Sequence, residues 1–191
     1  MMKLELPKEG RVLLHACCAP CSSAVVECML QNEIRPTILY YNPNIYPIEE
    51  YEIRKSENKR YIHALGVDFV DADYDHEGWL GDIEGLENEP ERGKRCLKCF
   101  TLRMLYTAKY AAHNGFSFFT TTLASSRWKN LSDIFIAGKH AEGCYPGVTF
   151  WDQNWRKGGL SERRREIIAE YNFYNQQYCG CEFGMSKPND K

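Results

Sequence analysis

The stretch RVLLHACCAPCSSAVVECMLQN, residues 11–32, joins two apolar segments through a loop rich in cysteine. The run at 11–16 is short and apolar, which predicts a buried strand. The segment after the loop has the period of a helix, and Ser22 or Ser23 is of the type that caps a helix N-terminus. Three cysteines lie at the junction: Cys17, Cys18 and Cys21. The stretch therefore predicts a strand–loop–helix unit that carries thiols in its loop.

The rest of the chain repeats this alternation of strand and helix. Further strands are predicted at 35–42, 67–74, 116–123 and 148–150. Helices are predicted at 48–66, 96–115, 133–140 and 160–172. Strands separated by helices pair in parallel through right-handed crossovers. We therefore expect an α/β fold, a three-layer sandwich with a mainly parallel sheet.

The length and composition fit one domain. A chain of 191 residues with 43% hydrophobic residues can bury a single core, so we expect one domain over 1–191. Residues 72–95 are acidic and rich in glycine, which predicts an irregular segment that could act as a lid. A cysteine-bearing C-terminal segment is expected at 173–185, and residues 186–191 are expected to fray.

Nine cysteines restrict the chemistry of such a chain. The first residues lack the apolar core of a signal peptide, and no run approaches the roughly 18 apolar residues of a membrane span. We therefore expect a cytoplasmic protein without a membrane partner, in which thiols stay reduced and structural disulfides do not form. Metal ligation or redox chemistry is the leading interpretation. The net charge of -2 leaves a nucleic-acid partner open.

Seven of the cysteines fall in three groups. The first group lies in the loop quoted above, in a place where parallel sheets gather ligands. Cys96 and Cys99 open a predicted helix, whose dipole favours thiolates. Cys179 and Cys181 flank Gly180, which permits a tight turn. A four-iron cluster or a zinc ion takes four ligands, so three thiols are left over.

We therefore expect two metal centres, a cluster on four cysteines beside a second metal on three, with one coordination position open for substrate. Adjacent side chains diverge in extended backbone, so Cys17 and Cys18 are expected to serve different centres. Cys28 lies among apolar residues and is expected in the core, and Cys144 is expected to be a loop thiol. We expect His15 to be a core histidine that forms a hydrogen bond with the backbone. This role is favoured over that of a metal ligand or of an acid.

Several motifs carry these features along almost the whole chain: HACCAPC, NPNIYP, RCLKC, FTTTLASS, FWDQNWRKGG and YCGC. With this combination the chain resembles the QueH-type epoxyqueuosine reductases, a family that completes queuosine in tRNA. The resemblance implies a [4Fe-4S] cluster next to a separately coordinated iron. The same division had followed from the ligand count alone.

The resemblance also assigns the seven thiols to the two centres. The implied cluster ligands are Cys18, Cys96, Cys99 and Cys179. The implied ligands of the adjacent iron are Cys17, Cys21 and Cys181. The order of Cys179 and Cys181 between the centres stays open. Some relatives carry Asp at the position of Cys21, and many carry Pro at that of Ser126.

The implied reaction removes the epoxide oxygen of epoxyqueuosine as water, with two electrons and two protons. The iron would bind the epoxide oxygen as a Lewis acid, and the cluster would relay electrons from an external donor. Catalysis is thereby implied for Cys17, Cys21 and Cys181. The candidates for the proton donor are His15, Glu91 and Asp152.

Recognition of tRNA would unstack the modified base onto aromatic side chains and hold the neighbouring phosphates with basic ones. The candidates are Tyr46, Arg54, Arg95, Arg103, Trp128, Lys129, Arg156 and Lys157. Each has a structural alternative. Tyr46 precedes Pro47 and could pack its loop, while Arg103 shares a helix with the CLKC pair and could support the cluster electrostatically.

Two other functions fit parts of the pattern. The order of elements resembles the ATP pyrophosphatase, or adenine-nucleotide-hydrolase-like, fold of tRNA-thiolation enzymes, some of which carry an iron–sulfur cluster. Their Ser-Gly-Gly-x-Asp-Ser phosphate loop is replaced here by HACCAPCSS, so ATP binding is not expected. A non-catalytic RNA-binding module held together by zinc is the second alternative. Such a module would be colourless, whereas an iron–sulfur protein would be brown and would bleach with dithionite.

Overall fold

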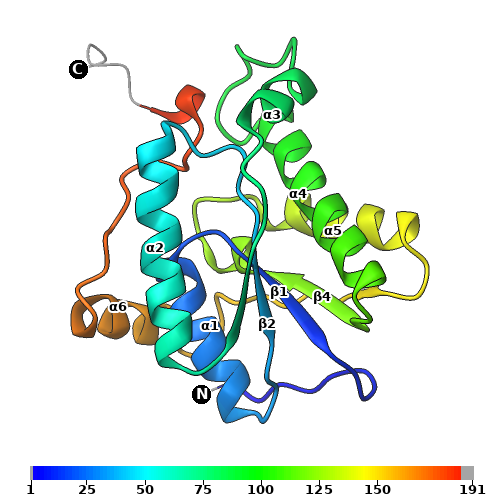
Figure 1. Cartoon of the computed structure of the whole chain (residues 1–191), viewed down its shortest axis with the longest axis vertical. Helices are drawn as coiled ribbons and strands as arrows, with labels where there is room; N and C mark the ends of the chain where they lie inside the picture. Colours follow the sequence, from blue (N-terminus) through cyan, green and yellow to red (C-terminus); the bar gives the residue numbers. More distant parts are fainter. Residues whose placement is uncertain (1, 186–191) are drawn as a thin grey trace.

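A five-stranded parallel sheet forms the centre of the molecule (Figure 1). The computed structural model describes residues 2–185. Its strands are β1 (Val12–Ala16), β2 (Thr37–Tyr40), β3 (Asp68–Asp71), β4 (Phe118–Thr121) and β5 (Thr149–Phe150). They are ordered β3-β2-β1-β4-β5, and every pairing is parallel. All five predicted strands are confirmed.

Helices cover both faces of the sheet. They are α1 (Ala19–Gln31), α2 (Ile48–Ala64), α3 (His76–Asp82), α4 (Lys94–His113), α5 (Leu131–Cys144) and α6 (Leu160–Glu170), with 3-10 turns η1 (Thr122–Ser125) and η2 (Glu182–Gly184). On one face α1 packs against α2 and α6, and on the other α4 packs against α5 (Figure 1). The predicted three-layer α/β sandwich is therefore confirmed.

The central strand β1 places the cysteine loop at the functional edge of the sheet. All five residues of β1 are buried, and His15 pairs with Leu39 of β2 on one side and with Thr121 of β4 on the other. The strand order changes direction between β1 and β4. In open parallel sheets, ligands bind at the carboxyl ends of the strands at such a switch point. The loop after β1 starts at this point.

Helix α1 begins at Ala19, earlier than a cap at Ser22 or Ser23 would allow. Cys18 is its N-cap, with extended backbone angles of φ -170° and ψ 164°, and Pro20 lies in the first turn. Proline favours that position because its missing N–H has no partner there in any case. The Ser22 hydroxyl donates to the Cys18 carbonyl at 2.6 Å and is buried inside the helix. Cys21 therefore lies in the first turn of α1.

The acidic segment 72–95, predicted as irregular, contains the helix α3. Asp75 accepts a hydrogen bond from the Gly78 N–H at 2.9 Å and caps α3. Helix α5 is also longer than predicted, so Cys144 ends a helix and does not lie in a loop. A lid at 72–95 stays a prediction, and residues 186–191, which were expected to fray, lie outside the described residues.

Two further findings concern the whole described chain. All nine cysteines are free thiols. No helix in the described residues has the length and apolar character needed to cross a bilayer.

Candidate metal centre

The junction between β1 and α1 brings three sulfurs together. The Sγ atoms of Cys17, Cys18 and Cys21 all lie within 4.8 Å of one another, and the three side chains are buried. No other three His, Cys, Asp or Glu side chains within residues 2–185 meet this condition. Thiolates about 2.3 Å from one tetrahedral ion are about 3.8 Å apart, and the sulfurs of Cys17 and Cys18 are 3.8 Å apart. The junction thus presents donors at the spacing of a metal site.

The predicted divergence of Cys17 and Cys18 is wrong. Their sulfurs are 3.8 Å apart, so the two side chains converge although Cys18 has extended backbone angles. Thr122 also fixes Cys17, because its hydroxyl accepts from the Cys17 N–H at 3.1 Å and lies 3.5 Å from the sulfur. Both sulfurs therefore face the same site.

Two basic side chains act on these thiols. Hydrogen bonds from the Cys18 and Cys21 thiols hold the pKa of Cys17 well below its ordinary value, and the charges of Lys129 and Arg103 act in the same direction, against burial. Burial opposes the charged form of Lys129, but nearby thiols, with the thiol of residue 179 first among them, raise its pKa. The hydrogen bonds to Cys17, together with burial, raise the pKa values of the Cys18 and Cys21 thiols. The site therefore favours the thiolate, the metal-binding form, at Cys17.

The remaining four thiols form a second group. Cys96 and Cys99 lie in the first turns of α4, and burial raises the pKa of both thiols, with Cys179 adding to the effect. Burial, and then the charges of Cys179 and Cys99, raise the pKa of Cys181 to about 12. Cys99 and Cys181 share one apolar cluster with residues of and after α3. The CLKC pair and the YCGC pair thus lie close enough for their charges to interact.

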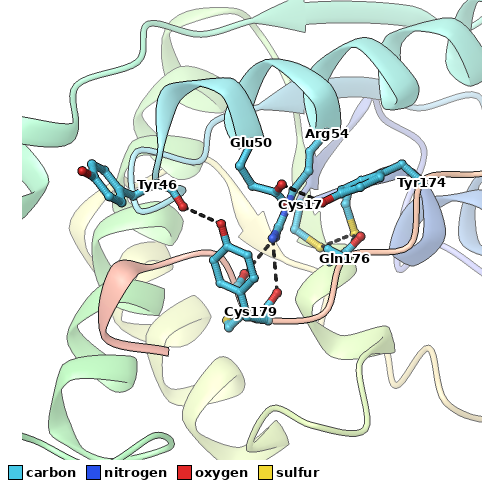
Figure 2. Close-up of polar contacts among 9 residues, drawn as sticks. Cys17, Tyr46, Glu50, Arg54, Tyr174, Gln176 and Cys179 are labelled. Atoms are coloured by element: carbon cyan, nitrogen blue, oxygen red, sulfur yellow. Dashed lines mark hydrogen bonds and ion pairs between the residues drawn. The ribbon is translucent and has the colours of Figure 1, made fainter. Parts of the chain in front are cut away.

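A buried ion pair on α2 holds the C-terminal segment in place (Figure 2). Arg54 is 3% exposed, and its Nε donates to Glu50 at 2.7 Å. Its other two nitrogens donate to the carbonyl oxygens of Tyr178 at 3.2 Å and Cys179 at 3.1 Å. Tyr174 donates to the same Glu50 carboxylate at 2.7 Å. The pair therefore fixes the backbone that carries the last two thiols.

A cavity of about 650 Å³ opens against the thiols. Its volume lies in the range of small-molecule sites. The first thiol group lies in its wall together with Cys179. The basic and aromatic side chains that line it include Arg54, Arg103, Arg127, Trp128, Lys129 and Arg164. The cavity thus combines sulfur donors, positive charge and one exposed aromatic side chain.

His15 is fully buried at the end of β1. Its Nε2 donates to the Tyr41 carbonyl at 3.0 Å, and its Nδ1 accepts from the Thr121 hydroxyl at 2.8 Å. Burial and the charge of Arg103 lower the pKa of His15 to about 3. The prediction of a core histidine bonded to backbone is therefore confirmed. Its neutral ring ties the end of β1 to the neighbouring strands.

Three of the predicted tRNA contacts are buried arginines. Arg54, Arg95 and Arg103 are each at most 3% exposed. Arg95 donates to three carbonyl oxygens of residues 86–89, the closest at 2.5 Å, and Arg103 donates to the side chain of Asn42. These contacts favour a structural role for the three arginines over direct binding of a tRNA phosphate.

The other candidates lie nearer the surface. Trp128 is 62% exposed and, like Lys129, lines the cavity. Arg156 donates to the Lys129 carbonyl at 2.7 Å and so supports this loop. Tyr46 and Lys157 are exposed outside the cavity lining. Of the two remaining proton-donor candidates, Glu91 lines the cavity, whereas Asp152 is exposed elsewhere.

Two site residues were missed at the level of sequence. The Asn42 amide donates to the Ala16 carbonyl at 3.0 Å and so fixes the end of β1. Its position directly after a predicted strand, in the NPNIYP motif, was a usable signal. The Gln176 amide donates to the sulfur of Cys18 at 2.9 Å. No local pattern pointed to Gln176, because its partner is 158 residues away in the chain.

Comparison with known proteins finds one family over most of the chain. The family model described as "Epoxyqueuosine reductase QueH" matches residues 12–187. Curated proteins named epoxyqueuosine reductase QueH are 48% identical over 188 residues in Histophilus somni and in Haemophilus influenzae, covering 98% of this chain and 77% of each relative. The Acinetobacter baylyi protein of the same name is 46% identical over 189 residues, which cover 98% of this chain and 87% of the relative. The chain therefore belongs to the epoxyqueuosine reductase QueH family.

Proposed function

We propose that this protein is an oxidoreductase that converts epoxyqueuosine in tRNA to queuosine. The observation that carries the proposal is the three-sulfur group at the junction of β1 and α1, in the wall of a cavity of about 650 Å³. Relatives over nearly the whole chain bear the name of this activity. The reaction takes two electrons and two protons, breaks both C–O bonds of the epoxide, forms a C=C bond and releases water.

We propose seven thiolates as ligands of a [4Fe-4S] cluster and an adjacent iron. Cys18, Cys96, Cys99 and Cys179 are proposed for the cluster, and Cys17, Cys21 and Cys181 for the iron. The donor set fits such groups, because all seven are free thiols and the sulfurs of three of them lie within 4.8 Å of one another. When bound, the cluster would supply single electrons from an external donor, and the iron would supply a Lewis acid for the epoxide oxygen.

The residues of the chain have separate tasks in this proposal. Lys129 and Arg103 offset the negative charge of the thiolates. His15 orients the end of β1 through its two ring nitrogens. Glu91 is proposed as the proton donor, because it is the one of the three candidates that lines the cavity.

The tRNA would meet the protein at the cavity mouth. Trp128 is exposed there, and the guanidinium of Arg127 lies 5.0 Å from the centroid of its ring. An exposed indole offers a surface on which an unstacked base can lie, and guanidinium groups hold the adjacent phosphates. We propose Trp128, Arg127 and Lys129 as the first contacts.

Anaerobic reconstitution tests the function directly. The protein is loaded with iron and sulfide, incubated with epoxyqueuosine-containing tRNA and a reductant, and the nucleosides are analysed by mass. Loss of one oxygen from the modified nucleoside is expected. The Cys144→Ser variant is a matched control, since this thiol is exposed at the end of α5, away from the cavity lining. A loaded, reduced protein that leaves the nucleoside mass unchanged would overturn the proposal.

The division of ligands has its own test. Because the sulfurs of Cys17 and Cys18 are 3.8 Å apart, either thiol can reach the neighbouring centre. Cys18→Ala is expected to abolish the visible absorption of the cluster, whereas Cys17→Ala keeps that absorption and loses turnover. Iron counts and absorption spectra of the two variants are compared. A Cys18→Ala protein that keeps the cluster and loses one iron would move Cys18 to the other centre.

A further inference from the structure

The side chain of Gln176 contacts a cysteine sulfur of the candidate metal centre. Its Nε2 donates to the sulfur of Cys18 at 2.9 Å, and its Oε1 is buried with no donor among residues 2–185. Cys18 is 2% exposed and caps α1. The amide therefore reaches a sulfur that water cannot readily solvate.

The segment around Gln176 is anchored on both sides. Two residues before it, the Tyr174 hydroxyl donates to Glu50 at 2.7 Å. Two residues after it, the Tyr178 carbonyl accepts from Arg54 at 3.2 Å, and the next carbonyl accepts from the same guanidinium. The buried ion pair of α2 thus holds the backbone at both ends of a short span. The amide has little freedom to leave the sulfur.

We infer that Gln176 is a positioning residue that sets the reduction potential of the metal centre bound through Cys18. The inference rests on the proposed function, which makes Cys18 a metal ligand. A hydrogen bond to a ligating sulfur draws negative charge from it and so favours the reduced state, which raises the reduction potential. The same C-terminal segment supplies Cys179, so one segment provides both a ligand and a hydrogen bond to a ligand.

Redox titration of the reconstituted protein tests this role. Gln176→Leu keeps similar bulk and removes the donor, so the midpoint potential of the loaded protein is expected to shift downward. Gln177→Leu is the matched control, because the neighbouring glutamine is exposed and donates no side-chain hydrogen bond among residues 2–185. Its midpoint is expected to equal that of the unchanged protein. Gln176→Asn, with a shorter amide, is titrated as well, so that the potential is measured even where the leucine variant holds no metal.

The result is read independently of turnover. A downward shift in the Gln176 variants but not in Gln177→Leu supports the inference. Equal midpoints in all loaded variants overturn it, even if the protein is an active reductase. Conversely, a protein that binds iron but does not alter the nucleoside refutes the proposed activity. The comparison of midpoint potentials still tests the role of Gln176 in that case.

Discussion

Gly180 is the residue on which the spacing of the last two thiols depends. Its φ is +132°, a region that residues with a side chain rarely adopt. A Cβ atom here would lie 3.1 Å from Ile45, 3.2 Å from Arg54 and 3.3 Å from Asn44. The backbone between Cys179 and Cys181 thus passes close to the loop before α2 and to Arg54, and a Cβ atom would fit only if these neighbours shifted.

Replacing Gly180 with alanine is expected to displace the C-terminal thiols. The strained φ and the close contacts together cost about 1–3 kcal/mol, and part of this cost is relieved when the segment lifts away. The midpoint temperature of thermal unfolding is expected to fall. The iron content after reconstitution is expected to fall as well. Gly143→Ala is the control, since Gly143 lies at an exposed position of α5 and an added Cβ meets nothing within 4 Å. This substitution is expected to raise stability by about 0.5–1 kcal/mol. Full iron content in Gly180→Ala would contradict this account.

At the scale of elements, the first turns of α2 bind the C-terminal segment. Arg54 and Glu50 form a pair at 3% and 10% side-chain exposure, and the pair binds three groups of the C-terminal segment. A buried charge that loses its partner is costly, because neither water nor an opposite charge compensates it. The helix therefore works as an anchor for the cysteine-bearing segment.

Arg54→Ala is expected to lower the free energy of unfolding by about 3–5 kcal/mol, the usual cost of breaking a buried pair. Urea denaturation measures the free energy of unfolding. The iron content of the reconstituted variant is expected to fall as well. Lys59→Ala, at an exposed position on the same helix, is the control and is expected to change stability by less than about 0.5 kcal/mol. An Arg54→Ala protein as stable as Lys59→Ala would show that the pair does not anchor the segment.

Local patterns predicted the elements better than the contacts between them. The apolar runs and their spacing predicted five strands and the parallel sheet, because burial of strands leaves a local signature. The start of α1 was predicted too late, since Cys18 and Pro20 begin the helix before the serines. Arg54 was expected on tRNA, yet its partners lie 124 and 125 residues away, and no local pattern encodes such a contact.

At the scale of the whole molecule, the site is assembled from three distant parts of the chain. The thiols come from the junction of β1 and α1, from α4 and from the C-terminal segment. A metal that binds only the folded arrangement stabilises it, and the effect is greatest for the part that has the fewest other contacts. The C-terminal segment is the one held mainly by polar contacts to α2.

Metal loading is therefore expected to slow amide hydrogen exchange in residues 174–181 more than in β1. Exchange is followed by mass spectrometry of peptides from the reconstituted and the chelator-treated protein. Strand β1 is fully buried in the centre of the sheet, so its exchange is already slow and serves as the internal reference. Equal protection of both regions on loading would argue against ligands in the C-terminal segment.

The strand order also bears on how separate copies of the molecule behave toward each other. A sheet with free edges can recruit a strand from another chain, which is a route to aggregation. Here one edge strand, β5, is two residues long, and the other, β3, begins and ends with aspartate. Asp71 lies 3.4 Å from Lys55, which adds a second charge beside that edge. Both edge strands are thus poor templates for pairing with a strand of another molecule. This property disfavours aggregation of a thiol-rich protein before its metals are bound.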